Sequence, residues 1–300
     1  MRNLLICLTL ISVVSCAPKN TSPTNNVKNS SIINGSNVKE NDAINKSIVA
    51  VLNTKSQYLC TGSLIAPNII LTAAHCAPDR ISNVKIIFGT DIDNIMGSLE
   101  PDVKDEHILQ AVDFKVSSSW NPKDETREID TGDIMLIKFK GNVPEGYAPA
   151  TFLADDSSLK IGTVVTVAGY GVDDVDTSKE VNIKKFPNLE DAIQSGEVTC
   201  QDEANGKHAH CFKVQMSGDG ILRTTKAPIN FIHETEINLN ETKSGTCSGD
   251  SGGPAYIEKN GDFFLFGVTS RGSGLCNEVG VYTNALFYKD WIAATIKAFN

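Results

Sequence analysis

Residues 246–254 read Thr-Cys-Ser-Gly-Asp-Ser-Gly-Gly-Pro, and this stretch governs how the rest of the chain is interpreted. A serine hydroxyl is a poor nucleophile at neutral pH, so a reactive one needs a base, a tight exposed turn and donors for the developing oxyanion. Gly249 can adopt backbone angles closed to other residues, which lets its N–H and that of Ser251 converge on one point. A simple Gly-Ser turn is the competing interpretation. The ordered string favours a catalytic serine, provided that partners occur elsewhere in the chain.

Composition narrows the class of protein. The chain has 300 residues, 41% of them hydrophobic, which is enough for one large domain or two small ones with a core. Its net charge of -9 and the lack of a basic run argue against nucleic acid as a partner. Eight cysteines are present; without Cys7 and Cys16 of the leader, six remain, an even number that suits disulfides in an exported protein.

The N-terminus has the pattern of an export signal. Arg2 precedes an apolar run at residues 4–14, which is too short to cross a bilayer comfortably. A signal peptide over residues 1–15 is therefore favoured over a retained transmembrane helix.

Cys16 and the residues after it suggest an anchor and a tether. The end of the apolar run, Val13-Val14-Ser15-Cys16, resembles a bacterial lipoprotein signal, in which diacylglyceryl is attached to the cysteine sulfur. Cleavage after Ser15 as in an ordinary signal peptide, without lipidation, is the alternative. Residues 16–31 are polar and predict a flexible tether or propeptide, lipid-anchored if Cys16 is modified. The protein is expected to be exported, either to the cell envelope as a lipoprotein or as a secreted protein after processing.

From residue 48 the chain is a succession of short β-rich segments separated by turn residues. Strands are predicted at 48–52, 62–66, 69–73, 84–88, 111–116 and 134–139, and then at 164–170, 225–231, 254–258, 263–269 and 280–284. Residues 291, 292, 295, 296 and 299 fall on one face of a terminal helix. The polar segment 172–195 is interpreted as a loop. Two antiparallel barrels or sandwiches are predicted.

A base and its orienting acid have one good candidate each. His75 lies in the segment Leu-Thr-Ala-Ala-His-Cys at 71–76, at the end of an apolar strand. At this position a histidine that only packs in the core is as good an interpretation as a catalytic base. Asp133 precedes the apolar strand at 134–139, where an isolated acid is usually a turn residue. A carboxylate shielded from water could hold the imidazole in the correct orientation.

Together the three strings resemble those of the chymotrypsin-like (trypsin-fold) serine proteases, and the resemblance covers residues 32–300. It implies an all-β fold with two antiparallel six-stranded β-barrels, a C-terminal α-helix and a catalytic cleft between the barrels. It also implies a serine endopeptidase without a cofactor. Ser251 would be the nucleophile, His75 the base and Asp133 its orienting acid, with the N–H groups of Gly249 and Ser251 as the oxyanion hole.

The resemblance also implies substrate-binding residues and disulfides. Ser270 matches the segment that pairs with substrate as an added strand. The other matching substrate-binding positions are Gly245, Ser248, Gly272 and Gly280. The implied disulfides are Cys60–Cys76 and Cys247–Cys276.

Cys200 and Cys211 have no counterpart in the family pattern. The ten residues between them suit a closed hairpin. A disulfide is favoured there over a metal site that would include His208 and His210. The acidic residues Asp91, Asp93 and Glu100 occupy a loop where some relatives bind calcium, but a solvated loop is favoured, and no metal is predicted.

Activation in the family follows a cut before an Ile-Val-Gly-Gly-like start, whose new amino group pairs with the Asp before the nucleophile. Ile32-Ile33-Asn34-Gly35 and Asp250 match this pattern. A zymogen cut before Ile32 by another, unidentified protease is therefore predicted. Ser31 precedes the cut, so that protease is not expected to cleave after basic residues. The same cut would release a lipid-anchored enzyme from the membrane.

Gly245 stands where trypsin-type enzymes carry an Asp that binds basic side chains. Lys and Arg are therefore not expected at P1, the substrate residue before the cut bond; an apolar or aromatic residue is the first expectation. Arg271 replaces a Trp usual in the family, which makes an acidic P1 residue the second. Protein or peptide substrates are expected. The alternative is a catalytically silent homologue that acts as a binding or adhesion lipoprotein.

Overall fold

The computed structural model describes residues 32–97, 105–121, 132–186, 188–202 and 208–299. The predicted signal peptide and tether, with Cys16 and Ser31, lie outside these residues, as does Glu100 of the acidic loop. None of the helices within the described ranges is both long enough and apolar enough to span a membrane.

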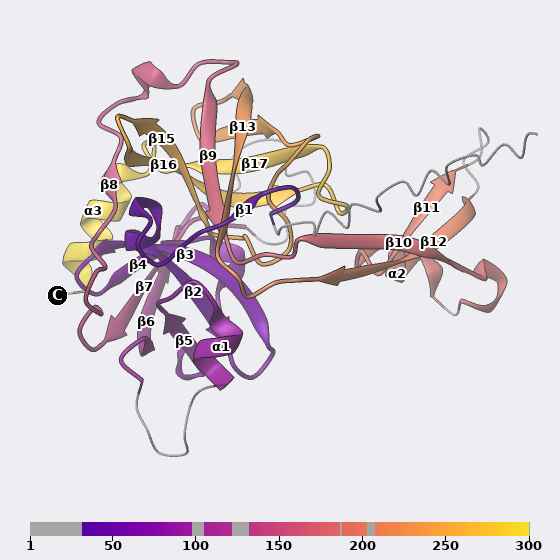
Figure 1. Ribbon diagram of the computed structural model, residues 1–300, viewed down its shortest axis with the longest axis horizontal. Coiled ribbons are helices and arrows are strands. Elements are labelled where there is room, and N and C mark those ends of the chain that lie inside the picture. Colours follow the sequence, from indigo (N-terminus) through magenta and orange to yellow (C-terminus); the bar gives the residue numbers. More distant parts are fainter. Residues whose placement is uncertain (1–31, 98–104, 122–131, 187, 203–207, 300) are drawn as a thin grey trace, which may run out of the picture.

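Six strands from the first half of the chain, β2–β7, close into an antiparallel barrel, drawn in indigo to magenta in Figure 1. The strands are β2 (Ile48–Asn53), β3 (Tyr58–Ala66), β4 (Ile69–Thr72), β5 (Val84–Ile87), β6 (Ile108–Val116) and β7 (Met135–Lys140). Their order around the barrel is β2-β3-β4-β7-β6-β5. All residues of β4 are buried, as are most of β7, which explains why both strands read as nearly continuous apolar runs.

The second barrel also has six antiparallel strands. These are β9 (Val164–Gly169), β13 (Arg223–Ile232), β14 (Glu236–Asn240), β15 (Pro254–Lys259), β16 (Asp262–Gly272) and β17 (Val279–Asn284). The ring closes because β9 pairs with both β13 and β15. The short strands β1 (Ser36–Asn37) and β8 (Thr151–Phe152) attach to β13 and β16. The predicted fold of two six-stranded barrels is confirmed, and among the strands of these two barrels only β14 was not predicted.

The C-terminal helix α3 (Lys289–Ala298) follows the second barrel but packs on the first. Its Ile292 and the following Phe299 belong to the apolar cluster of the first barrel, and Lys138 of β7 donates a hydrogen bond to the Phe299 carbonyl. The remaining helices are short. They are η1 (Ala43–Ser47), η2 (Ala74–Cys76), η3 (Ile81–Asn83), α1 (Ile92–Gly97), η4 (Asp156–Ser158), η5 (Ile183–Lys185) and α2 (Leu189–Gln194).

The segment predicted to be a loop, 172–195, is instead part of an arm that projects from the barrels (Figure 1). In the arm, β10 (Asp174–Val181), β12 (His208–Ser217) and β11 (Val198–Asp202) form an antiparallel sheet in that order. The arm has its own apolar cluster around Ala192, Val198 and Cys211. The prediction was wrong because β10 alternates exposed polar residues with half-buried ones, so its apolar content is low.

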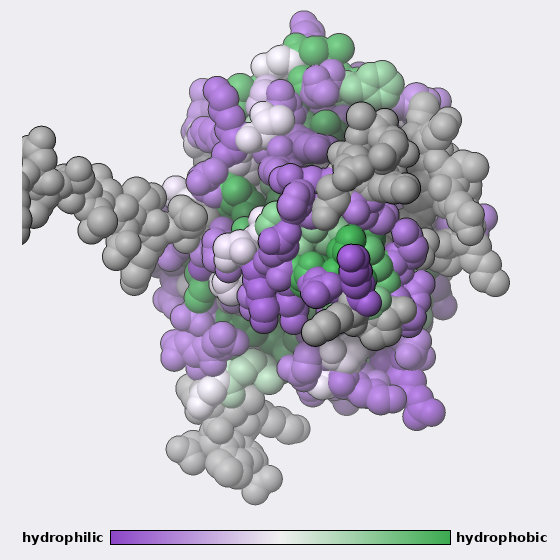
Figure 2. All heavy atoms as spheres, turned by 90° about the vertical axis from the view of Figure 1, so that its right-hand side faces the viewer, coloured by the Kyte–Doolittle hydropathy of each residue, from purple (hydrophilic) through white to green (hydrophobic). Residues whose placement is uncertain are grey.

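Figure 2 views the molecule from the side of the arm and shows hydrophilic residues over much of this face, with a smaller hydrophobic patch near its centre.

A disulfide joins Cys200 of β11 to Cys211 of β12, which are direct partners in the ladder. The predicted closed hairpin is therefore present.

We expect the Cys200–Cys211 disulfide to stabilise the arm and not the barrels, because the arm has a separate apolar cluster. Replacing both cysteines with Ser should weaken the arm by about 3 kcal/mol, the loop-closure value for a ring of this size. Hydrogen exchange of the β10–β12 amides should then become roughly 10²-fold faster, with unchanged exchange in β2–β7. The paired replacement of Cys60 and Cys76 is the control, and it should affect the first barrel. Equal loss of protection in arm and barrels would contradict the prediction.

Candidate active site

The loop that carries Ser251 depends on two glycines. Gly249 and Gly252 have φ angles of 97° and 81°, in the left-handed region. A Cβ on Gly249 would lie 2.8 Å from Cα of Gly171, and one on Gly252 would lie 1.9 Å from Oγ1 of Thr72. The loop therefore fits between the two barrels only because these positions lack side chains.

Thr61 of β3 fixes this loop to the first barrel. Its N–H donates to the Ser251 carbonyl at 2.8 Å, and its hydroxyl donates to the Gly249 carbonyl at 2.9 Å. The same hydroxyl accepts from the N–H of Tyr170, which follows β9 of the second barrel, at 3.1 Å. Thr61 thus connects both barrels to the residues on either side of the turn.

Asp250 is completely buried beside the turn. Its carboxylate accepts from the N–H groups of Gly171 at 2.7 Å and Cys247 at 2.8 Å. A Cβ on Gly169 would lie 2.2 Å from the Asp250 carboxylate, so the Gly-Tyr-Gly sequence at 169–171 leaves the space for it. Burial raises the pKa of Asp250 to about 7, although the two N–H donors oppose this shift.

His75 lies in η2, directly after β4, and Asp133 holds it at two points. The ring Nδ1 is 2.8 Å from Oδ2 of Asp133, and the backbone N–H of His75 donates to Oδ1 at 2.9 Å. Because the acid binds both backbone and ring, it fixes where the imidazole lies and how it is turned. A ring N–H directed at Asp133 leaves the other ring nitrogen, Nε2, as a base.

Asp133 itself is almost fully buried, at 2% exposure. Burial opposes its ionisation, but the hydrogen bonds and charge of His75, with a hydrogen bond from Ser270, outweigh burial and lower its pKa. The Ser270 hydroxyl donates to Oδ2 at 2.6 Å. Thr283 of β17 donates to the Asp133 carbonyl at 2.9 Å, so the second barrel also supports this residue.

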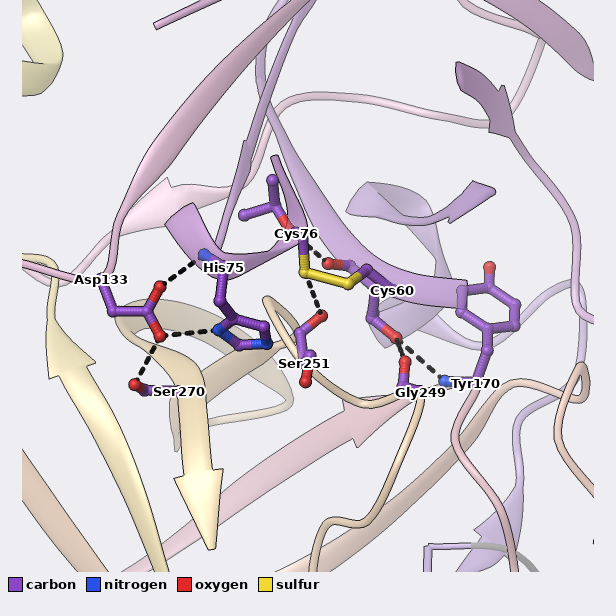
Figure 3. The surroundings of a disulfide bond; sticks show 10 residues. Cys60, His75, Cys76, Asp133, Tyr170, Gly249, Ser251 and Ser270 are labelled. Atoms are coloured by element: carbon purple, nitrogen blue, oxygen red, sulfur yellow. Dashed lines mark hydrogen bonds and ion pairs between the residues drawn. A yellow bond between two sulfur atoms is a disulfide. The ribbon is translucent and has the colours of Figure 1, made fainter. Parts of the chain in front are cut away.

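The structure brings together three residues that are far apart in the chain. His75 and Asp133 are 58 positions apart, and Ser251 follows 118 positions later. Figure 3 shows Asp133, His75 and Ser251 in a row at the junction of the barrels. Asp133 is buried, whereas His75 and Ser251 are partly exposed, so a substrate could reach the two reacting groups.

The disulfides support the same region. Cys60–Cys76 joins β3 to the turn that carries His75, and Cys247–Cys276 joins the Ser251 loop to the loop before β17. In the arm, Cys200 and Cys211 form a disulfide and hence offer no thiolates to a metal. His208 and His210 contact Glu190 and Glu180 instead. In the acidic loop, Asp91 accepts from the N–H of Asn94 within α1.

The predicted start of the mature chain lies against the Ser251 loop. Ile32 is completely buried, and Ile33 forms a β-bridge with Gly245. The Asn34 side-chain amide donates to the carbonyl of Lys243 at 2.7 Å. Residues 32–34 are thus placed beside the segment that leads to the nucleophile.

The predicted substrate-binding residues line one edge of the second barrel. Gly272 and Gly280 are partners across β16 and β17. Ser248 accepts from the N–H of Val172 at 2.9 Å through its carbonyl. Gly245 lies against a residue that the sequence did not single out, Glu241, whose side chain is buried next to it.

Glu241 and Arg271 change the basis of the P1 expectations. The expectation against Lys and Arg depends on the lack of an acid at Gly245, but Glu241 supplies an acid at that place. The acidic alternative depends on a free Arg271, but its guanidinium forms hydrogen bonds with both carboxylate oxygens of Glu236, at 2.8 and 2.7 Å. The only sequence signal for Glu241 is an acid four residues before Gly245.

Comparison with known proteins agrees with this geometry. Brachyurin of Leptuca pugilator is 27% identical over 256 residues, which cover 81% of this chain and 90% of that protein. Urokinase-type plasminogen activator of Gallus gallus is 28% identical over 261 residues, which cover 81% of this chain and 52% of that protein. Snake venom serine protease 1 of Craspedocephalus gramineus is 26% identical over 255 residues, which cover 84% of this chain and 82% of that protein.

The family model described as Trypsin matches residues 32–292, which include both barrels and all three residues in the row. The chain therefore belongs to the trypsin family of serine-type endopeptidases.

Proposed function

We propose that this protein hydrolyses peptide bonds through an acyl-enzyme on Ser251, with His75 as the base and Asp133 as its orienting acid. The observation that carries the proposal is the double hold of Asp133 on His75, next to Ser251 (Figure 3). A histidine that served only the core would not need a buried carboxylate on both its ring and its backbone.

The proposed first step acylates the serine. Oγ of Ser251 attacks the carbonyl carbon of the substrate while Nε2 of His75 takes the hydroxyl proton. The carbonyl oxygen becomes an oxyanion and accepts from the N–H groups of Gly249 and Ser251. Collapse breaks the C–N bond, and His75 returns the proton to the leaving amine. Asp133 stabilises the imidazolium between these two transfers.

The second step releases the acid product. Water attacks the acyl carbonyl while His75 removes a proton from it, and the new tetrahedral intermediate collapses to expel Oγ of Ser251, which regains its proton from His75. The lowered pKa of Asp133 keeps this acid ionised while the ring becomes charged. Ser270 helps to maintain that state through its hydrogen bond to Oδ2.

The protein is further proposed to be exported and made as a zymogen. Cleavage before Ile32 would create an ammonium group that pairs with the buried Asp250. The complete burial of Ile32 and the bridge between Ile33 and Gly245 support this idea. The activating protease would be a partner, and Cys16, if lipidated, would hold the uncut form at the membrane.

Replacing Ser251 with Ala should lower peptide hydrolysis by about 10⁴- to 10⁶-fold, because the nucleophile and its base act as a unit. It should also abolish labelling by an active-site phosphonate, while the circular dichroism spectrum and Tm stay unchanged. Ser195→Ala, an exposed serine on the arm, is the matched control and should label normally. If the wild-type protein does not react with the probe after activation, the silent-homologue alternative is correct.

Cleavage before Ile32 should stabilise the protein, and the gain should depend on pH. In the uncut chain the pKa of Asp250 is about 7, above its value in the unfolded chain. Its ionisation therefore costs stability above about pH 7, and this cost disappears as the pH falls toward about 4. A new ammonium group would offset the cost only where Asp250 is charged. The Tm gain on cleavage should thus be largest near pH 8 and small near pH 4.

This comparison is best made in the Ser251→Ala background, which prevents self-digestion. Asp250→Asn should remove the gain, whereas the exposed Asp42→Asn should retain it. A Tm gain that is the same at pH 4 and pH 8 would argue against the ion pair. An active form that begins at a residue other than Ile32 would refute the proposed cleavage site.

A further inference from the structure

Glu241 lies against Gly245, the position that the family resemblance assigns to the base of the P1 pocket. It directly follows β14, and its N–H donates to the Glu278 carbonyl at 2.8 Å. A Cβ on Gly280 would lie 2.4 Å from Oε2 of Glu241, and one on Gly245 would lie 2.6 Å from its Cδ. The carboxyl therefore occupies the space that side chains at both glycine positions would otherwise fill.

The hydrogen-bond partners of this carboxyl are neutral. The Tyr282 hydroxyl donates to Oε1 at 2.5 Å, and the Thr246 N–H donates to Oε2 at 3.2 Å. The Thr246 hydroxyl also lies within hydrogen-bond distance of the carboxyl. Within the described part of the chain, no Lys, Arg or His forms an ion pair with Glu241.

The basic residues nearest to Glu241 in the sequence and the pocket do not neutralise it. Lys243 is exposed. Arg271 is bound through both of its terminal nitrogens to Glu236, which is also buried. Two buried acids thus lie at this edge of the second barrel, and the structure supplies a cation to only one of them.

Burial raises the pKa of Glu241 to about 7, although the hydrogen bonds from Tyr282 and Thr246 oppose the shift. A buried carboxylate is costly without a cation, and a cation that arrives beside it favours the ionised form. A buried carboxyl of this kind would discriminate between a cationic side chain and a neutral one of the same shape.

We infer, on the basis of the proposed function, that Glu241 is the residue that selects the P1 side chain, and that it selects Lys or Arg. The carboxyl lies against Gly245 and Gly280, so the N–H donors of a long unbranched P1 side chain that reached these glycines would meet it there. The charge comes from the end of β14, four residues before Gly245, and not from the position where trypsin-type enzymes carry it. This inference replaces the sequence-based expectation of an apolar or acidic P1 residue.

The test uses the activated enzyme and peptide substrates that differ only at P1. Arg is compared with citrulline, which has nearly the same shape without the charge, and Lys, Leu, Phe and Ala complete the series. For the wild-type enzyme, kcat/KM for Arg and Lys should exceed that for citrulline by about 10²-fold or more. Inhibition by the cation benzamidine should exceed that by neutral benzamide by a similar factor.

Glu241→Gln keeps the size and hydrogen-bonding capacity of the side chain but removes its charge. It should lower kcat/KM for Arg and Lys by about 10²-fold, and change that for citrulline and Leu less than about threefold. Glu241→Asp should keep part of the preference for Arg. Glu258→Gln, on the surface of β15 and paired with Lys226, is the matched control and should leave every ratio unchanged. The benzamidine comparison needs no variant and holds even if Glu241→Gln fails to fold.

The outcomes separate this inference from the proposed function. A wild-type enzyme that labels with the phosphonate but prefers Leu, Phe or Ala refutes the role of Glu241 and leaves the proposed function intact. An equal loss on all P1 residues in Glu241→Gln shows that the carboxyl only supports the loop, and also refutes the inference. A wild-type enzyme that is not labelled by the phosphonate and hydrolyses none of the peptides refutes both the inference and the proposed function.

Discussion

The buried carboxylate of Asp250 is the constraint around which this end of the molecule is organised. Through Cys247 and Gly171 it ties the Ser251 loop to the end of β9, and only glycine at 169 and 171 leaves room for it. Water cannot solvate a completely buried group, so the protein must supply every partner of this charge. The two N–H donors therefore hold the backbone of the Ser251 loop against the residue that follows Tyr170.

Two buried glutamates near the pocket illustrate how the same residue type takes different roles. Glu236 receives both nitrogens of Arg271 and is a closed ion pair. Among the residues that the structure describes, Glu241 receives only hydroxyl and amide donors. A closed pair contributes shape and stability to the barrel edge, whereas a carboxyl with only neutral donors keeps its capacity to bind a cation. Burial alone does not distinguish them; the identity of the partners does.

Much of the fold could be predicted from the sequence because several barrel strands, such as β4 and β7, are mostly buried and therefore apolar. Residues 134–139 are an example: the run is apolar because β7 is covered on both sides. β14 was missed because it is short and begins with Glu236, which is buried with an ion partner. β10 was missed because a sheet in an exposed arm needs few apolar residues. Local composition reveals neither the ion partner of a buried Glu236 nor the exposed position of β10.

The residues of the candidate site likewise include some that the sequence predicts and one that it does not. His75, Asp133 and Ser251 lie in ordered strings that local sequence reveals. Glu241 lies in a polar stretch with no such string, and its position depends on the register that sets Leu239 of β14 opposite Gly280 of β17. Contacts of this kind arise from strand pairing across about 40 residues, and one sequence does not encode them in any short pattern.

The arm leaves and re-enters the second barrel between β9 and β13, and this point of attachment has a structural consequence. Gly169 and Arg223 are ladder partners, so the two ends of the inserted segment are already held side by side. The loop-closure entropy of an insertion grows only slowly with its length. A module placed there can thus be lengthened, replaced or removed without altering the register of any barrel strand. Its root nevertheless contacts the catalytic loop, since the N–H of Val172 binds the carbonyl of Ser248. The arm is therefore a place where the protein could acquire new surfaces next to its active site while its hydrolytic machinery stays the same.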